Sequence, residues 1–295
     1  MQGQLFAPAA PDLEPPGKPP AQLLKWIGSK RRSAAAIVLA FPRHFNTYHE
    51  PFLGGGAVLG LLKPKRAVAS DRLRPLIEIW QTLGNDLPLL CQWYAQRWQT
   101  LQGPDKVAQY RILRDRYNVE PNGGDLLMLS RACYGGVIRF TKDGAMNTPC
   151  GPHKPIPPEA FAKRAADWQQ RTAGTTFIHA DFAETLDAAK AGDLVYCDPP
   201  YADSEATLYG AQAFTLERLF QTIDRCKARG VYVALSIDGW KRSGSHACAI
   251  PMPDGLFESD APMVVGRSML RRFQMQGQTL EEEVVADRLL RTWKD

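Results

Sequence analysis

The sequence predicts an α/β protein with a doubly wound parallel sheet. Short apolar runs typical of buried strands recur along the chain, and longer stretches with helical periodicity separate them. Strands that alternate with helices form parallel sheets covered by helices on both faces, so this alternation predicts the fold class. The predicted strands span residues 47–52, 67–70, 175–179, 193–197 and 231–237.

Composition places the chain among ordinary globular proteins. It has 295 residues, 44% of them hydrophobic, and its net charge of +5 indicates a mild attraction to polyanions that enzymes without a nucleic-acid partner also have. The cysteines are scattered without a C-x-x-C pair or a histidine cluster, so we expect neither a disulfide framework nor a bound metal. The absence of an export signal or a long apolar run predicts a cytoplasmic protein without membrane contact.

The spacing of the predicted strands divides the chain into a tail, a sheet domain and an insert. Residues 1–20 are rich in proline, which predicts a disordered tail. Residues 73–171 separate the second strand from the third and are too many for one crossover helix, so we expect a subdomain inserted between 21–72 and 172–295. Residues 241–295 carry no chemical motif, and their last part fits either a closing strand or a helix.

The sequence pattern of the insert changes along its length. Its pattern is helical up to about Cys133. Beyond that point a strand-like run meets the turn Asp143-Gly144, which predicts a β-hairpin over residues 137–149 with basic side chains on its arms.

A glycine-rich turn follows the first predicted strand, and an acid follows the second. The run EPFLGGGAV, residues 50–58, leads from a strand into a helix, as in doubly wound folds that bring backbone close to a cofactor. Its spacing is not G-x-G-x-x-G, which disfavours a dinucleotide. Asp71 ends the second strand, where a carboxylate accepts hydrogen bonds from ribose hydroxyls; the alternative is a helix N-cap.

A third pair of residues, Asp181 and Phe182, follows the third predicted strand. Alone, Asp181 is better explained as a helix N-cap. Three successive strands, however, end in glycines or acids at the sheet edge where such folds bind ligands. Together they predict a nucleoside-type cofactor, with Asp181 and the ring of Phe182 beside its base.

The fourth predicted strand runs into Asp198, Pro199, Pro200 and Tyr201. The two prolines fix the backbone and remove two amide donors, which leaves carbonyl oxygens as outward acceptors. An aromatic amine is a poor nucleophile, and a carboxylate and a carbonyl that accept its two hydrogens favour the pyramidal nitrogen of the transition state. Tyr201 would stack on the base. The alternative is a tight proline turn.

This ordered set of motifs resembles the Dam-like, D12 class of adenine-N6 DNA methyltransferases. The resemblance covers most of the chain beyond the tail and includes residues 24–30, 50–56, 130–151 and 198–201 with Asp71 and Asp181 between them. It implies a Rossmann-like methyltransferase sheet that binds S-adenosylmethionine, formed by 21–72 and 172–295, and a target-recognition subdomain formed by 73–171.

The resemblance also implies roles for single residues. Trp26 and Lys30 would help to close over the cofactor, and Asp198 would serve both catalysis and the cofactor pocket. The cofactor-binding residues that it implies are Trp26, Lys30, Glu50, Phe52, Gly54, Gly56, Asp71, Asp181, Phe182 and Asp198.

The hairpin aligns with the segment that reads bases of double-stranded DNA. Arg139 would pair with a guanine edge in the major groove. The residues implied to contact DNA are Lys25, Tyr134, Gly135, Arg139 and Pro149. Relatives that read GATC usually carry asparagine at the position of Gly135, so the target sequence stays open.

The resemblance also implies that the target adenine is flipped out of the duplex. Adenine N6 lies inside the duplex stack, so the base has to be flipped out; residues 202–214, with Tyr209 or Phe214 as a wall, either cover it or form a plain surface loop. The amine would attack the methyl group directly, without a covalent enzyme intermediate.

Cytosine N4 or a protein glutamine is the alternative substrate, and a non-catalytic DNA-binding protein is the alternative class. A partner restriction endonuclease is compatible with the family.

Overall fold

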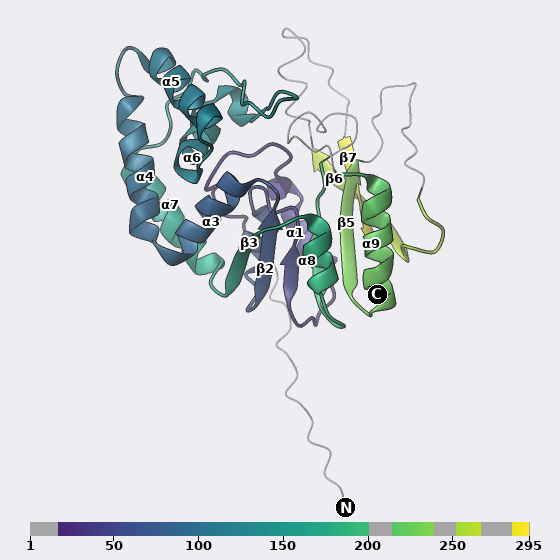
Figure 1. Cartoon of the computed structure of the whole chain (residues 1–295). Helices are drawn as coiled ribbons and strands as arrows, with labels where there is room; N and C mark the ends of the chain where they lie inside the picture. The colour runs from purple at the N-terminus through teal and green to yellow at the C-terminus, as the bar shows by residue number, and fades with distance from the viewer. Residues whose placement is uncertain (1–16, 201–213, 239–251, 267–284, 295) are drawn as a thin grey trace, which may run out of the picture.

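A seven-stranded sheet forms the centre of the computed structural model, which describes residues 17–200, 214–238, 252–266 and 285–294 (Figure 1). The strand order is β3-β2-β1-β4-β5-β7-β6. Strands β1 to β5 are parallel, and β7 runs antiparallel to both β5 and β6. The strands are β1 Tyr48–Glu50, β2 Ala67–Asp71, β3 Thr175–His179, β4 Leu194–Cys197, β5 Tyr232–Asp238, β6 Ser259–Gly266 and β7 Val285–Arg291.

The sheet confirms the predicted doubly wound fold class and every predicted strand. Strand β1 is shorter than expected and stops at Glu50, because Pro51 has no amide hydrogen to continue the ladder. Strand β7 shows that the ambiguous C-terminal pattern is a strand, and β6 was not predicted. The two form an antiparallel edge beside β5.

Helices cover both faces of the sheet, and the two faces have separate cores. Helices α8 and α9 pack on one face with Val195 and Cys197, whereas α1, α2 and α3 share a larger core on the other face with Leu194 and Tyr196 (Figure 1). The helices and 3-10 turns are η1 Lys30–Arg32, α1 Ala34–Leu39, α2 Ala57–Leu62, α3 Arg74–Asn85, α4 Leu87–Thr100, α5 Lys106–Val119, α6 Gly123–Ala132, η2 Tyr134–Gly136, α7 Pro158–Arg171, α8 Phe182–Ala188 and α9 Leu216–Ala228.

The topology creates a crevice between β1 and β4. After β1 the chain adds β2 and then β3 on one side, and after β4 it adds β5 on the other side. The carboxyl ends of two neighbouring parallel strands therefore lead away in opposite directions, and ligands of doubly wound sheets bind at such a switch point.

Helices α4 to α7 gather beyond the β3 edge of the sheet (Figure 1). Helix α3 packs against β2 and β3 as well as α6, so it joins the sheet to the insert. The predicted hairpin is present as two isolated bridges, Phe140 with Met146 and Cys133 with Cys150, instead of a continuous ladder. The domain bounds at 73 and 171 stay predictions.

Some expectations fall outside the described residues. Tyr201 of the tetrapeptide, Tyr209 and residues 1–16 of the predicted tail belong to this group. The backbone oxygens of Pro19 and Pro20 accept hydrogen bonds from Arg31, so contacts with the fold begin just before the predicted end of the tail.

Candidate active site

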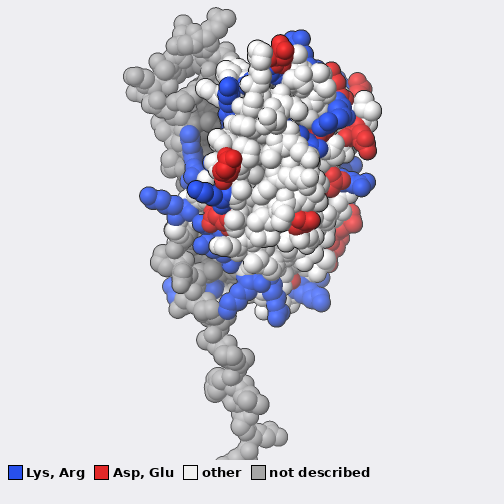
Figure 2. Space-filling view, turned by 90° about the vertical axis from the view of Figure 1, so that its left-hand side faces the viewer, with Lys and Arg blue, Asp and Glu red and all other residues white. Residues whose placement is uncertain are grey.

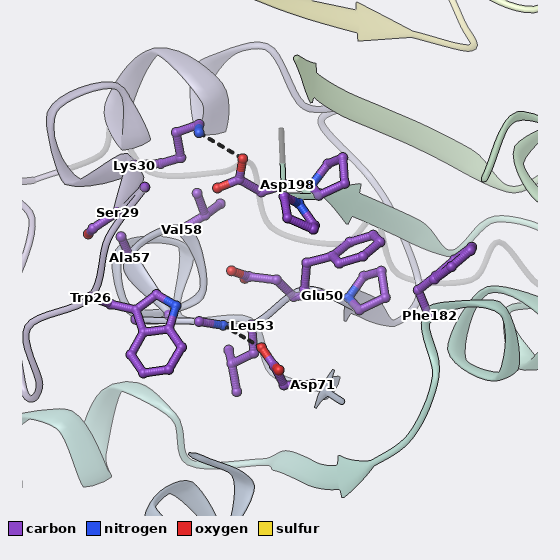
Figure 3. A pocket seen from close by; sticks show the side chains of 18 of the residues that line it. Trp26, Ser29, Lys30, Glu50, Leu53, Ala57, Val58, Asp71, Phe182 and Asp198 are labelled. Atoms are coloured by element: carbon purple, nitrogen blue, oxygen red, sulfur yellow. Dashed lines mark hydrogen bonds and ion pairs between the residues drawn. The ribbon is translucent and has the colours of Figure 1, made fainter. Parts of the chain in front are cut away.

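One pocket at the carboxyl edge of β1, β2 and β4 brings together the described residues predicted for the cofactor and for catalysis (Figure 3). The residues come from strand ends, helix starts and the segment before η1, which lie far apart in the sequence. The predicted residues that line it are Trp26, Lys30, Glu50, Phe52, Gly54, Gly56, Asp71, Asp181, Phe182, Asp198, Pro199 and Pro200.

The glycine turn after β1 requires glycine at two positions. Gly54 has φ +48° and Gly56 has φ +62°, a backbone region that side chains disfavour. A Cβ atom at Gly54 would lie 2.9 Å from Cδ1 of Trp26, and one at Gly56 would lie 3.0 Å from Cη2 of Trp80. The indole of Trp26 thus covers the turn directly, and the backbone forms the floor of the pocket.

The carboxylate of Asp71 joins the end of β2 to this turn. It accepts hydrogen bonds from the backbone N–H of Gly54 and of Leu73, both at 3.0 Å. Helix α3 begins after Leu73, so Asp71 is not its N-cap and that alternative is wrong. Burial raises the pKa of Asp71, and the backbone hydrogen bonds offset part of that rise.

Glu50, the last residue of β1, is buried and points into the pocket (Figure 3). Its Oε2 accepts hydrogen bonds from the Tyr48 hydroxyl at 2.7 Å and from the Leu59 N–H at 3.1 Å. Burial raises the pKa of Glu50 to about 8, and the nearby Asp198 carboxylate contributes to the rise. An acid buried at this position gains from a cationic ligand, because a cation favours its ionised form.

Asp198 follows β4 directly and pairs with Lys30 from η1. Lys30 Nζ lies 2.7 Å from Asp198 Oδ1, and the lysine side chain is 5% exposed (Figure 3). A buried ammonium needs such a partner, since an isolated charge would be costly to desolvate. The pair fixes the Asp198 carboxylate at the pocket edge beside Pro199 and Pro200.

Asp181 caps helix α8, as the simpler interpretation predicted. Its Oδ1 accepts from the Ala183 N–H at 3.0 Å, and its own N–H donates to Glu184, which completes a capping box. Arg218 from α9 binds the same carboxylate at 2.7 Å, a partner that the sequence did not indicate. Asp181 lines the pocket as well, so the cap does not exclude a ligand contact.

Three phenylalanines form an aromatic cluster at one end of the pocket. The rings of Phe52 and Phe182 are stacked with centroids 5.4 Å apart, and Phe214 meets them edge-on at 5.9 and 5.7 Å. All three line the pocket. Such a cluster offers an apolar surface to a flat ring.

The residues predicted to contact DNA lie outside this pocket, around the hairpin. Tyr134 N–H donates to the carbonyl of Pro149 at 2.8 Å, and the Lys25 side chain lies over Gly136, where a Cβ would come within 2.7 Å of Lys25 Cδ. Tyr134, Arg139 and Pro149 are exposed. Gly135 has φ +65°, a conformation that asparagine also adopts more readily than most residues.

The segment before Trp26 is fastened to the insert. Arg131 donates to the carbonyls of Gln22 and Leu23 at 3.0 and 2.8 Å, and Trp168 donates to that of Ala21 at 2.7 Å. Residues of the insert therefore hold the segment that carries both Lys25 and Trp26.

Neither a metal site nor a membrane span occurs in the described parts of the chain. They hold no group of three or more histidine, cysteine or acidic side chains arranged to bind a metal ion. No helix among the same residues is long and apolar enough to cross a membrane.

A doubly wound sheet with a ligand pocket at its switch point is the architecture of enzymes that bind nucleoside-type cofactors. Residues 26–247 match the family described as D12 class N6 adenine-specific DNA methyltransferase. The chain belongs to this family and is an adenine-specific DNA methyltransferase.

Named relatives agree with this assignment. The Retron Ec67 DNA adenine methylase of Escherichia coli is 31% identical over 204 residues, which cover 65% of this chain and 67% of the relative. A DNA adenine methylase of Vibrio cholerae serotype O1 is 30% identical over 72% of this chain and 79% of its own. A DNA N-6-adenine-methyltransferase of Escherichia phage P1 is 28% identical over 74% of this chain and 30% of its own. Adenine in DNA is therefore favoured over the alternative substrates and the non-catalytic class.

Proposed function

We propose that the pocket binds S-adenosylmethionine and that Asp198 and the adjoining prolines bind the amino group of a flipped adenine beside it. The observation that carries the proposal is the convergence of the glycine turn, the acids and the two prolines after Asp198 on one pocket at the switch point. Each of these features alone could serve only the fold, as Asp181 illustrates by capping helix α8.

The residues present fit this cofactor. The glycine turn presents backbone at the pocket floor, where the methionine part would lie, and Glu50 offers a counter-charge to its ammonium. Asp71 keeps acceptor capacity for ribose hydroxyls beyond its two amide hydrogen bonds. The aromatic cluster of Phe52, Phe182 and Phe214 suits a purine ring. When bound, the cofactor supplies a methyl group activated by its sulfonium.

Asp198 and a proline carbonyl would act on the amine. Each accepts one hydrogen of adenine N6, which directs the nitrogen lone pair away from the ring and toward the methyl carbon. The bound cofactor would supply the methyl group to this lone pair, with the electron pair of the C–S bond left on sulfur and the N6 proton released to water. Lys30 holds the Asp198 carboxylate in place for this step.

Lys25, Tyr134, Gly135, Arg139 and Pro149 would contact double-stranded DNA. The exposure of Tyr134, Arg139 and Pro149 around one hairpin supports this role, as does the position of Lys25 over Gly136. Lysine and arginine side chains project from the left margin of the face shown in Figure 2, which would favour a polyanion there. Adenine N6 is inaccessible in the duplex stack, so the base is flipped before transfer.

The experiment replaces Asp198 and follows labelled methyl transfer to duplex DNA. We expect Asp198→Ala to lower the transfer rate by about 100- to 1000-fold, as removal of a group that acts on the transition state does, while DNA binding stays measurable. Asp187→Ala, which removes an exposed acid paired with Arg225, is the control and should keep its rate. Retention of most activity by Asp198→Ala would contradict the mechanism.

A further inference from the structure

A buried acid from the last strand reaches the active site. Asp287 of β7 is 6% exposed, and its Oδ2 lies 3.7 Å from Lys30 Nζ, the ammonium that also contacts Asp198. Asp287 belongs to no motif and lies beyond residues 26–247, which carry the family match. One lysine therefore lies between two carboxylates, and only one of them was expected.

The antiparallel edge of the sheet explains how Asp287 arrives there. Strand β7 runs opposite to β5 and pairs Asp287 with Asp238, the last residue of β5. The carboxyl end of β5 lies on the same sheet edge as the carboxyl end of β4, where Asp198 follows. A strand that entered parallel to β5 would place its first residues at the opposite edge, far from the pocket.

The charges of these three residues do not balance. With both acids ionised, Asp198, Lys30 and Asp287 carry one net negative charge in a largely buried setting. Burial raises the pKa of Asp287 and the Asp198 carboxylate adds to the rise, whereas Lys30 lowers it. An acid kept at such a position without a second cation within ion-pair distance among the described residues is unfavourable for folding, which suggests a role in the reaction.

We propose that Asp287 is a positioning residue for methyl transfer that acts through Lys30. By sharing the lysine, it leaves the Asp198 carboxylate with more of its negative charge to accept hydrogen bonds from the adenine amino group. The amino nitrogen gains positive charge as the new bond forms, and the Asp198 carboxylate stabilises that charge. This inference rests on the proposed role of Asp198.

The test is Asp287→Asn, which removes the charge and nearly keeps the shape. We expect kcat to fall about tenfold, the effect of roughly 1.4 kcal/mol, with KM for DNA and the Kd of S-adenosylhomocysteine changed less than threefold. Asp287→Glu restores the charge and should recover most of kcat. A purely structural residue would instead lower the melting temperature and leave kcat of the folded enzyme unchanged.

A double variant tests whether Asp287 acts through Lys30. In a Lys30→Met background, Asp287→Asn should cause no further loss of kcat, because the ammonium that it shares is gone. Asp193→Asn is the matched control: this buried acid pairs with His49 at the far edge of β4, so its loss should lower stability but not kcat.

Three outcomes separate the inference from the proposed function. Wild-type kcat in Asp287→Asn overturns the inference, and so does an equal loss with and without Lys30. If Asp287→Asn does not fold, Asp287→Ser provides the same comparison with a smaller side chain. Asp198→Ala with most of its activity would instead overturn the proposed function, whatever Asp287 does.

Discussion

The pocket and the hairpin are built in different ways, although we propose that both act in the methylation of a chosen adenine. In the pocket, strand ends fix the functional groups themselves: Asp71, Glu50 and Asp198 each have backbone or ionic partners. In the hairpin, the outward side chains of Tyr134 and Arg139 are exposed. The pocket groups are thus held by backbone and ionic contacts, whereas the hairpin side chains proposed to meet DNA lie at the surface.

Side chains of helix α5 form hydrogen bonds to the backbone of the hairpin. Tyr110 donates to the Thr148 carbonyl at 2.9 Å, and Asn118 both donates to the Met146 carbonyl at 3.0 Å and accepts from its N–H at 2.7 Å. Lys106 donates to the carbonyl of Gly151 at 2.7 Å. These bonds go to backbone groups, so substitutions of the outward side chains leave them in place.

Among the substitutions that test this contrast, we expect the largest loss of cofactor affinity at the pocket floor. Gly54→Ala puts a side chain at φ +48° and 2.9 Å from Trp26, which strains the turn and displaces the indole. We expect the Kd of S-adenosylhomocysteine, measured by calorimetry, to rise by about 100-fold, since backbone strain of this kind costs on the order of 1–3 kcal/mol before the indole moves.

Gly84→Ala in α3 is the control for that variant. A Cβ at Gly84 meets nothing within 4 Å, and alanine is the better helix former, so cofactor affinity should stay unchanged. Equal affinities in the two variants would show that the turn does not approach the cofactor.

A smaller effect is expected at the hairpin, and it should depend on the DNA sequence. Arg139→Ala should reduce methylation of the preferred site by about tenfold, within the 1–3 kcal/mol typical of a guanine contact, and relax preference at one base pair. Lys142→Ala, on the same exposed turn, should weaken all sites alike if it contacts phosphate. The measurement is sequencing of methylated positions in a random DNA library, and a uniform loss in Arg139→Ala would contradict base reading.

The same contrast explains what the sequence could predict. Strands β1 to β5 and their end residues follow from local patterns, because glycines, acids and prolines mark where a buried strand stops. The partners of those residues depend on packing between distant elements. Arg218 on Asp181 and Asp287 beside Lys30 require knowing which helix lies beside which and that β7 is antiparallel. The hairpin turn was predictable, but the support by Asn118 was not.

The last expected effect concerns stability and returns to the pocket. Burial raises the pKa of Glu50 to about 8 from an ordinary 4.5, so the folded protein keeps a proton that the unfolded chain loses between these values. The contribution of Glu50 to stability is therefore complete below about pH 4.5 and declines as the pH rises to about 8. Glu50→Gln mimics the protonated acid and can still accept from Tyr48 and Leu59.

Without cofactor, the melting temperature of Glu50→Gln should match that of the wild type near pH 5 and exceed it near pH 8. Each kcal/mol corresponds to about 2–4 °C for a domain of 150–250 residues. Other buried acids titrate equally in both proteins, so the difference isolates Glu50. Glu258→Gln is the control, because Lys227 lowers the pKa of exposed Glu258, so that this pKa lies below the range from pH 5 to 8. A Glu50→Gln difference that stays constant from pH 5 to 8 would show that Glu50 is ionised throughout, as a permanently paired acid would be.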